Sequence, residues 1–177
     1  AQEILPVVRD VPVFVAGGIG RGEAIVSYLE MGAAGCQLGT RFVCARESIA
    51  HPRFKQAFLR AEARDAMPTV QVDPRFPVIP VRALQNAGTR RFVEFQHEMI
   101  ERFRAGKIDQ KSAQLEIEHF WAGALRRAGA DGAAEKGSVA GGPSGGLVTR
   151  EQTVAEILAE LTEQAVRTIA AREQAAG

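Results

Sequence analysis

The sequence predicts an α/β protein, because it places a short apolar strand on either side of a helix. The run 11–16 is apolar, contains several β-branched residues, and ends at Gly17-Gly18. Helical spacing of apolar residues follows over 23–31, and a second apolar run covers 34–38. Continuous apolar strands are typical of parallel sheets that are buried on both faces, and parallel strands need a crossover connection such as this helix. These segments therefore predict one βαβ unit.

Length and charge limit what the chain can be. Its 177 residues, 46% of them apolar, suffice for one globular core, whereas a complete eight-stranded α/β barrel takes about 250 residues. Because the chain reaches a buried strand almost at once, we expect a further segment to precede it. The formal net charge is +1 and the arginines are scattered, as at Arg46, Arg60 and Arg104, so we expect no nucleic-acid partner and no membrane surface.

The cysteines and the lack of a long apolar run favour a cytoplasmic location. Cys36 and Cys44 lack CxxC spacing, so they predict neither a disulfide nor a metal site. The sequence shows no secretory leader and no run close to the roughly 18 apolar residues of a membrane span.

The middle of the chain is expected to mix helix and extended backbone. The segment 42–64 predicts a helix that is interrupted at His51-Pro52, because the residue before a proline disfavours the α region. The four prolines within 68–80 predict an extended excursion across the surface.

The rest of the chain is expected to be helical apart from one loop. Apolar spacing predicts helices over 90–105 and 110–127, whose aromatic residues form a core face. The segment 137–146 is a glycine-rich loop. Residues 149–152 have the form of a capping box that starts a last helix, whose end past residue 170 is expected to fray.

Two glycine turns are the best candidates for a ligand site. Gly17-Gly18 and Gly39-Thr40 follow consecutive predicted strands, and α/β proteins bind ligands at the carboxyl ends of their strands. Glycine lets the backbone approach a ligand closely, and a helix that starts after each turn adds the positive end of its dipole. Together with the Thr40 hydroxyl, the turns predict a cradle for a phosphate dianion, which barrels build after strands seven and eight. The alternative is that these glycines serve only tight turns.

Motifs along nearly the whole chain match one family in combination. They are 12–19, 35–42, Glu47-Ser48 with His51-Pro52 and Lys55, 80–84, 120–127 and 144–148. In this combination the chain resembles the C-terminal part of the nitronate monooxygenase family, formerly called 2-nitropropane dioxygenases, which also contains FMN-dependent enoyl-acyl-carrier-protein (enoyl-ACP) reductases.

The resemblance implies the C-terminal portion of a TIM (β/α)8 barrel followed by a mostly helical extension. About the last two βα units would occupy residues 1–65. Residues 66–148 would hold the proline-rich excursion, the helical pair and the glycine-rich loop, and residues 149–177 the C-terminal helix.

The resemblance also implies FMN as the cofactor. The residues expected at its phosphate are Ala16, Gly17, Gly18, Gln37, Gly39 and Thr40. One departure is Pro143, which stands where the family usually has a glutamine in the late glycine-rich loop; proline removes the amide side chain and a backbone donor. At this position the loop therefore offers the flavin neither the family's amide side chain nor a backbone N–H.

The resemblance implies that the family's catalytic histidine would lie upstream of this sequence. His51, His97 and His119 match no catalytic motif, so we predict that the chain itself holds no catalytic residue. By the resemblance, the leading function is oxidation of alkyl nitronates with O2 by bound FMN. Reduction of an enoyl thioester with NAD(P)H is the enzymatic alternative. A third reading is a truncated or partner-dependent fragment without activity of its own.

The expected partners are a small-molecule substrate and another polypeptide. The substrate would be a nitronate or an enoyl thioester. The polypeptide would be either a second copy of the chain or a complementing N-terminal barrel segment, because two strands alone leave open sheet edges.

Overall fold

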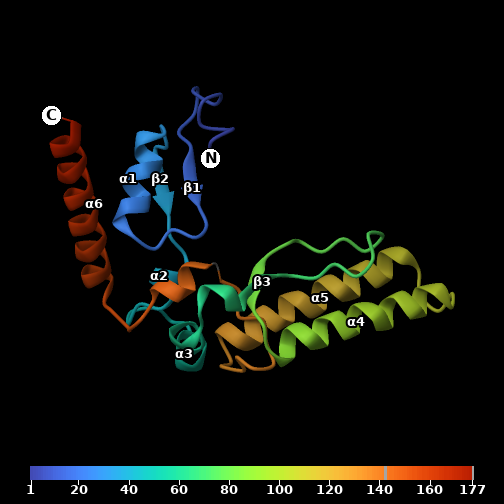
Figure 1. Ribbon diagram of the computed structural model, residues 1–177. Coiled ribbons are helices and arrows are strands. Elements are labelled where there is room, and N and C mark those ends of the chain that lie inside the picture. Colours follow the sequence, from blue (N-terminus) through green and yellow to red (C-terminus); the bar gives the residue numbers. More distant parts are fainter. Residues whose placement is uncertain (142, 177) are drawn as a thin grey trace.

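The fold begins with the expected βαβ unit (Figure 1). The computed structural model describes residues 1–141 and 143–176. In it, β1 (Phe14–Ala16) runs parallel to β2 (Gly35–Gln37), and α1 (Gly22–Glu30) connects them. The predicted parallel βαβ unit is therefore confirmed.

The first strand is shorter and more exposed than the sequence predicts. β1 covers three residues, and Val11 and Phe14 are 60% and 63% exposed. Among the described residues β1 pairs only with β2, so its other edge is open. The prediction of a strand buried on both faces is wrong for this chain, because such burial requires neighbours that the described residues do not supply.

The C-terminal helix α6 (Val154–Ala176) lies alongside α1 (Figure 1). The two helices approach closely at Gly22, where a Cβ would lie 2.3 Å from the carbonyl oxygen of Leu161. The backbone N–H of Gly22 donates a hydrogen bond of 2.8 Å to Oε1 of Gln164. The first residue of α1 is thus fixed directly to α6.

The ends of α6 differ from the prediction. The capping box forms between Thr153 and Glu156, since the Thr153 N–H donates to Glu156 Oε2 at 2.6 Å and the Glu156 N–H donates to Thr153 Oγ1 at 3.1 Å. It does not form at 149–152, because Gln152 instead binds other side chains. The helix also continues to Ala176, so the expected fraying past residue 170 is not observed.

Two short helices follow β2, namely α2 (Thr40–Val43) and α3 (Pro52–Arg60). The second starts at the predicted break at His51-Pro52, but the helix predicted before the break is wrong over 44–50, which are not helical. His51 is the N-cap of α3, and its Nδ1 accepts a hydrogen bond of 3.2 Å from the Arg53 N–H. Pro52 is the first helical residue, where its missing N–H costs no helical hydrogen bond.

The proline-rich excursion connects two short strands that the sequence did not predict. β3 (Ala66–Pro68) pairs antiparallel with β4 (Arg82–Leu84). The extended path between them agrees with the prediction for 68–80. Strands of three residues are too short to show an alternating pattern, which explains why they were missed.

A helical hairpin extends away from the βαβ unit, with α2 and α3 between them (Figure 1). It consists of α4 (Ala87–Arg104) and α5 (Gln110–Gly129). The rings of Phe95 and Phe120 stack with centroids 4.5 Å apart, and Phe92 is fully buried. The predicted aromatic core face is confirmed. None of the helices in the described ranges combines the length and hydropathy that crossing a membrane requires.

A buried cluster connects α2 and α3 to the hairpin. Two 3₁₀ segments, Ala63–Asp65 and Pro143–Leu147, lie next to it in the chain. Its buried apolar residues are Cys44, Phe54, Phe58, Ala66, Leu84, Ala128, Ala134, Val139 and Val148. Because Phe58 of α3 and Val139 of the glycine-rich loop both belong to this cluster, it fixes the loop beside α3.

Candidate functional site

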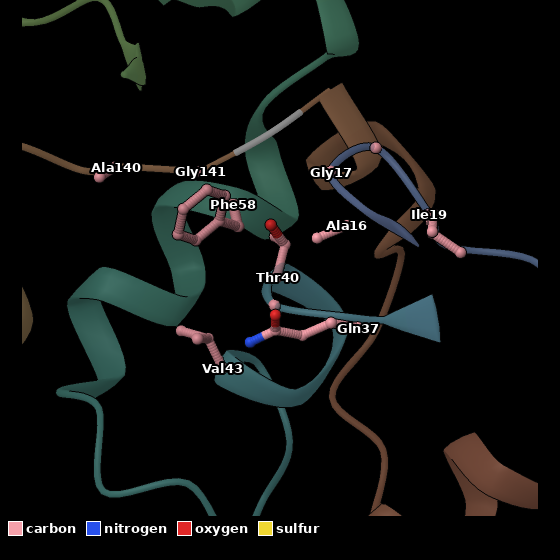
Figure 2. Close-up of a pocket in the computed structure, with 11 residues that line it drawn as sticks. Ala16, Gly17, Ile19, Gln37, Thr40, Val43, Phe58, Ala140 and Gly141 are labelled. Atoms are coloured by element: carbon pink, nitrogen blue, oxygen red, sulfur yellow. The ribbon is translucent and has the colours of Figure 1, made fainter. Parts of the chain in front are cut away.

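The carboxyl ends of β1 and β2 open into one pocket of about 350 Å³ (Figure 2). All six residues that the sequence singles out line it, namely Ala16, Gly17, Gly18, Gln37, Gly39 and Thr40. The structure thus brings the two glycine turns together at one edge of the sheet. Their expected role toward a cofactor phosphate remains a prediction.

The glycine turns leave open space beside the backbone. Gly17 and Gly18 have φ values of 96° and 72°, in the left-handed region that favours glycine. Gly39 has φ −100°, so its conformation alone does not require glycine. A Cβ on Gly17 or on Gly39 would meet no heavy atom within 4 Å. The tight-turn alternative therefore accounts for φ at the first turn but not for the open space at Gly39.

Hydrogen-bond donors gather at the start of α2. Gly39 is its N-cap and Thr40 its first residue, and the first N–H groups of a helix have no acceptor within it. Over residues 1–141 and 143–176, no protein acceptor binds the N–H of Gly39 or Thr40. Figure 2 shows the Thr40 hydroxyl between Ala16 and Phe58, with the Gln37 side chain nearby.

The first turn contributes less helix dipole than expected. α1 starts at Gly22, several residues after Gly18, and its first N–H is bound by Gln164. Ile19, which lies between, is buried. The prediction that a helix starts directly after each turn therefore holds for α2 and is wrong for α1.

The pocket has further walls that the sequence did not reveal. Ile19, Val43, Phe58, Ala140 and Gly141 also line it. The glycine-rich loop packs tightly here, since a Cβ on Gly141 would lie 2.2 Å from Cε1 of Phe58. The glycines of this loop were visible in the sequence, whereas nothing local distinguished Phe58 from other apolar helix residues.

The loop reaches the pocket because it pairs with β4. The Leu84 N–H donates to the Val139 carbonyl at 3.0 Å, and the Gly141 N–H donates to the Arg82 carbonyl at 3.0 Å. Gly142 lies outside the described residues, so the expectation for the adjacent Pro143 remains a prediction.

A buried arginine lies directly behind the second turn. Arg41 is 4% exposed, and its guanidinium donates to the Gly20 carbonyl at 3.4 Å and to Gln152 Oε1 at 3.1 Å. It also forms a salt bridge of 3.1 Å with Glu160. The Arg41 guanidinium and the Gln152 amide both bind the Glu160 carboxylate, and this lowers its pKa.

Titratable groups lie away from the pocket. No histidine, carboxylate or cysteine is among its described lining residues. His97 and His119 are exposed on the hairpin, and His51 caps α3. Both cysteines are free, and burial raises the pKa of the Cys44 thiol to about 11. The described lining residues therefore offer hydrogen-bond donors but no general acid or base.

Most of the chain matches a known protein family. The model of the family described as nitronate monooxygenase covers residues 2–164. This chain belongs to the nitronate monooxygenase family. The resemblance predicted from the motifs is confirmed, and this family consists of FMN-dependent oxidoreductases.

Individual relatives extend beyond this chain. A probable nitronate monooxygenase from Staphylococcus saprophyticus is 30% identical over 122 residues, which cover 69% of this chain and 30% of that protein. FabK from Thermotoga maritima superposes with a TM-score of 0.77 at 28% identity, covering 98% of this chain and 50% of FabK. The nitroalkane oxidase from Streptomyces ansochromogenes gives a TM-score of 0.64 at 26% identity, with 92% and 42% covered.

This family member therefore spans half or less of those relatives. Its fold is a partial TIM-like α/β fold. That its strands are the last two of the barrel, and that its parts divide at residues 65 and 148, remain predictions.

Proposed function

We propose that this chain forms the phosphate-binding end of the flavin site of an FMN-dependent nitronate monooxygenase, which oxidises alkyl nitronates with O2. One observation carries the proposal. The Gly17-Gly18 and Gly39-Thr40 turns share a pocket at the carboxyl ends of parallel strands, which is where barrels bind phosphate groups. Membership of an FMN-dependent family supplies a cofactor that carries such a group.

The lining residues fit a phosphate. The N–H groups of Gly39 and Thr40, the Thr40 hydroxyl and the Gln37 amide would donate hydrogen bonds to its oxygens. No carboxylate among the described lining residues would repel the dianion. The volume of about 350 Å³ is near the lower end of ligand pockets, which suits one end of FMN rather than the whole cofactor.

Bound FMN would supply the electron transfer of the reaction. The residues of this chain would grip and orient it, with Phe58 and Val43 forming an apolar wall beside the phosphate. The described residues that line the pocket carry no side chain that ordinarily titrates near neutral pH. We therefore assign proton transfer, where the reaction needs it, to residues outside this pocket.

A second candidate function is reduction of an enoyl thioester with NAD(P)H. The structural similarity to FabK, an enoyl-ACP reductase, favours it, because that similarity covers nearly all of this chain. The phosphate grip would be the same in both enzymes. The two functions differ in the electron donor and in the substrate that meets the flavin.

Either function would require more protein than the described residues. The open edge of β1 and the exposed side chain of Phe14 support completion of the sheet by another barrel segment or, less directly, by a second copy of the chain. Without that completion, we expect the chain to be inactive alone.

The phosphate grip can be tested with the substitution Gly39→Leu in the complete protein. The leucine side chain would enter the open space beside the backbone, so FMN affinity should fall by about a hundredfold or more. Gly129→Ala is the control, because it also adds carbon into open space but lies at the end of α5, away from the pocket. Quenching of flavin fluorescence measures binding.

Equal FMN affinity in both variants and in the unmodified protein would rule out this pocket as the phosphate site. Two activity assays on the FMN-loaded protein then separate the functions. Oxidation of an alkyl nitronate with O2, without NAD(P)H, supports the first. Enoyl reduction that depends on NAD(P)H, without nitronate oxidation, supports the second.

A further inference from the structure

We propose that Arg41 is a positioning residue through which the C-terminal helix α6 holds the two glycine turns of the pocket in their relative positions. The proposal rests on the proposed phosphate site. Arg41 directly follows Thr40 at the start of α2, and its Nη1 donates to the carbonyl of Gly20 at 3.4 Å. Gly20 lies two residues beyond the Gly17-Gly18 turn. One buried side chain therefore connects the second turn to the first.

The guanidinium is itself held by α6. Glu160 accepts hydrogen bonds from Arg41, Gln152 and Gln164 through its two carboxylate oxygens, at 3.2, 2.7 and 3.3 Å. Gln164 in turn accepts from the Gly22 N–H at 2.8 Å. The segment after the first turn is consequently fixed to the same part of α6 at both Gly20 and Gly22, once through Arg41 and once directly.

The local sheet contributes little to this positioning. β1 and β2 are three residues long and pair only with each other among the described residues. The Arg41 side chain is 4% exposed and that of Glu160 33% exposed, and hydrogen bonds in such a partly buried network are stronger than in water and favour one geometry. The planar guanidinium reaches Gly20, Gln152 and Glu160 at once, which the single ammonium group of lysine does not reproduce.

FMN binding and the docking of α6 should stabilise each other. If the docked helix holds the two turns at the spacing that the phosphate needs, FMN binding must in turn stabilise the docked helix, because coupling between two sites is reciprocal. The network lies behind the pocket wall, since neither Arg41 nor Glu160 lines the pocket. Arg41 therefore acts on FMN through the turns.

Variants of the complete protein test the proposal by FMN affinity and by amide hydrogen exchange over residues 17–22 without FMN. Arg41→Lys should weaken FMN binding by about tenfold and speed that exchange. The double variant Arg41→Met/Glu160→Leu replaces the ion pair with apolar side chains, which often restores stability. It should regain thermal stability while FMN affinity stays low. Arg167→Gln, which loses an exposed ion pair on α6 away from the turns, is the control and should match the unmodified protein.

Two results would overturn the proposal. One is unchanged exchange over residues 17–22 in Arg41→Lys. The other is recovery of FMN affinity together with stability in the double variant, which would make Arg41 a purely structural residue. If the unmodified protein did not bind FMN, the proposed function would be refuted instead. The hydrogen-exchange comparison needs no FMN, so it would still show whether Arg41 couples α6 to the two glycine turns.

Discussion

The contact between α1 and α6 gives the sharpest test of the packing. Gly22→Ala would place a Cβ 2.3 Å from the carbonyl oxygen of Leu161, 2.6 Å from the backbone N of Ala165 and 2.7 Å from Cβ of Gln164. Two of these neighbours are backbone atoms, so the helices must separate for the methyl group to fit. Overpacking of this kind costs about 1–3 kcal/mol. Separation also stretches the hydrogen bond from the Gly22 N–H to Gln164. Weakening that bond lowers the free energy of unfolding by about a further 1 kcal/mol.

Urea denaturation of the complete protein measures this cost, with Gly129→Ala as the matched control. Gly129 is also helical but has open space around a Cβ, so its substitution should be neutral or stabilising by up to about 1 kcal/mol. Gly22→Ala should be less stable than the control by roughly 2–4 kcal/mol. Equal stability of the two variants would refute the close contact between α1 and α6.

Three further predictions concern titration, thiol reactivity and capping. The pKa of Glu160 in the folded protein lies below its ordinary value of 4.5, chiefly because Arg41 binds the carboxylate. The carboxylate therefore stabilises the fold above pH 4.5, and this stabilisation is lost as the pH falls through the folded pKa. In Glu160→Gln, urea denaturation at a series of pH values should show a smaller loss of stability at acid pH. Burial raises the pKa of Cys44 to about 11, so iodoacetamide at pH 8 should label the partly exposed Cys36 first and Cys44 only on unfolding. Asn86→Ala removes a helix cap and two hydrogen bonds to loop carbonyls, so it should cost about 2–3 kcal/mol, against about 1 kcal/mol for loss of a cap alone.

Local patterns predicted that the two glycine turns lie together, because each turn is a local feature of the chain. Gly17-Gly18 and Gly39-Thr40 each end a strand, and the parallel βαβ connection places such ends at one edge. That rule alone brings the two turns into one pocket. The walls supplied by Phe58 and Gly141 depend instead on a tertiary contact between α3 and a loop far along the chain, which no spacing in the sequence reveals.

The start of α6 shows how a tertiary contact can select between two local signals. Residues 149–152 and 153–156 both fit the capping-box pattern of a threonine followed three residues later by glutamine or glutamate. Within the first of these, Gln152 is drawn to Arg41 and Glu160, and it is no longer available to cap a helix. The second box then starts the helix. The sequence correctly predicted a capping box but placed it four residues too early, because Arg41, which binds Gln152, lies more than a hundred residues away in the chain.

Arg41 is the residue whose importance the sequence hid most completely. Its neighbours Gly39 and Thr40 carry the visible motif, whereas its own partners lie on α6 and beyond the first turn. An isolated buried charge is costly, so Arg41 stays buried only while Glu160 faces it, and this condition ties the pocket to the far end of the chain. Two strands of three residues do not by themselves fix the relative positions of the two glycine turns. In this chain, the turns that would grip a phosphate depend on a helix of 23 residues that contributes no residue to the pocket lining.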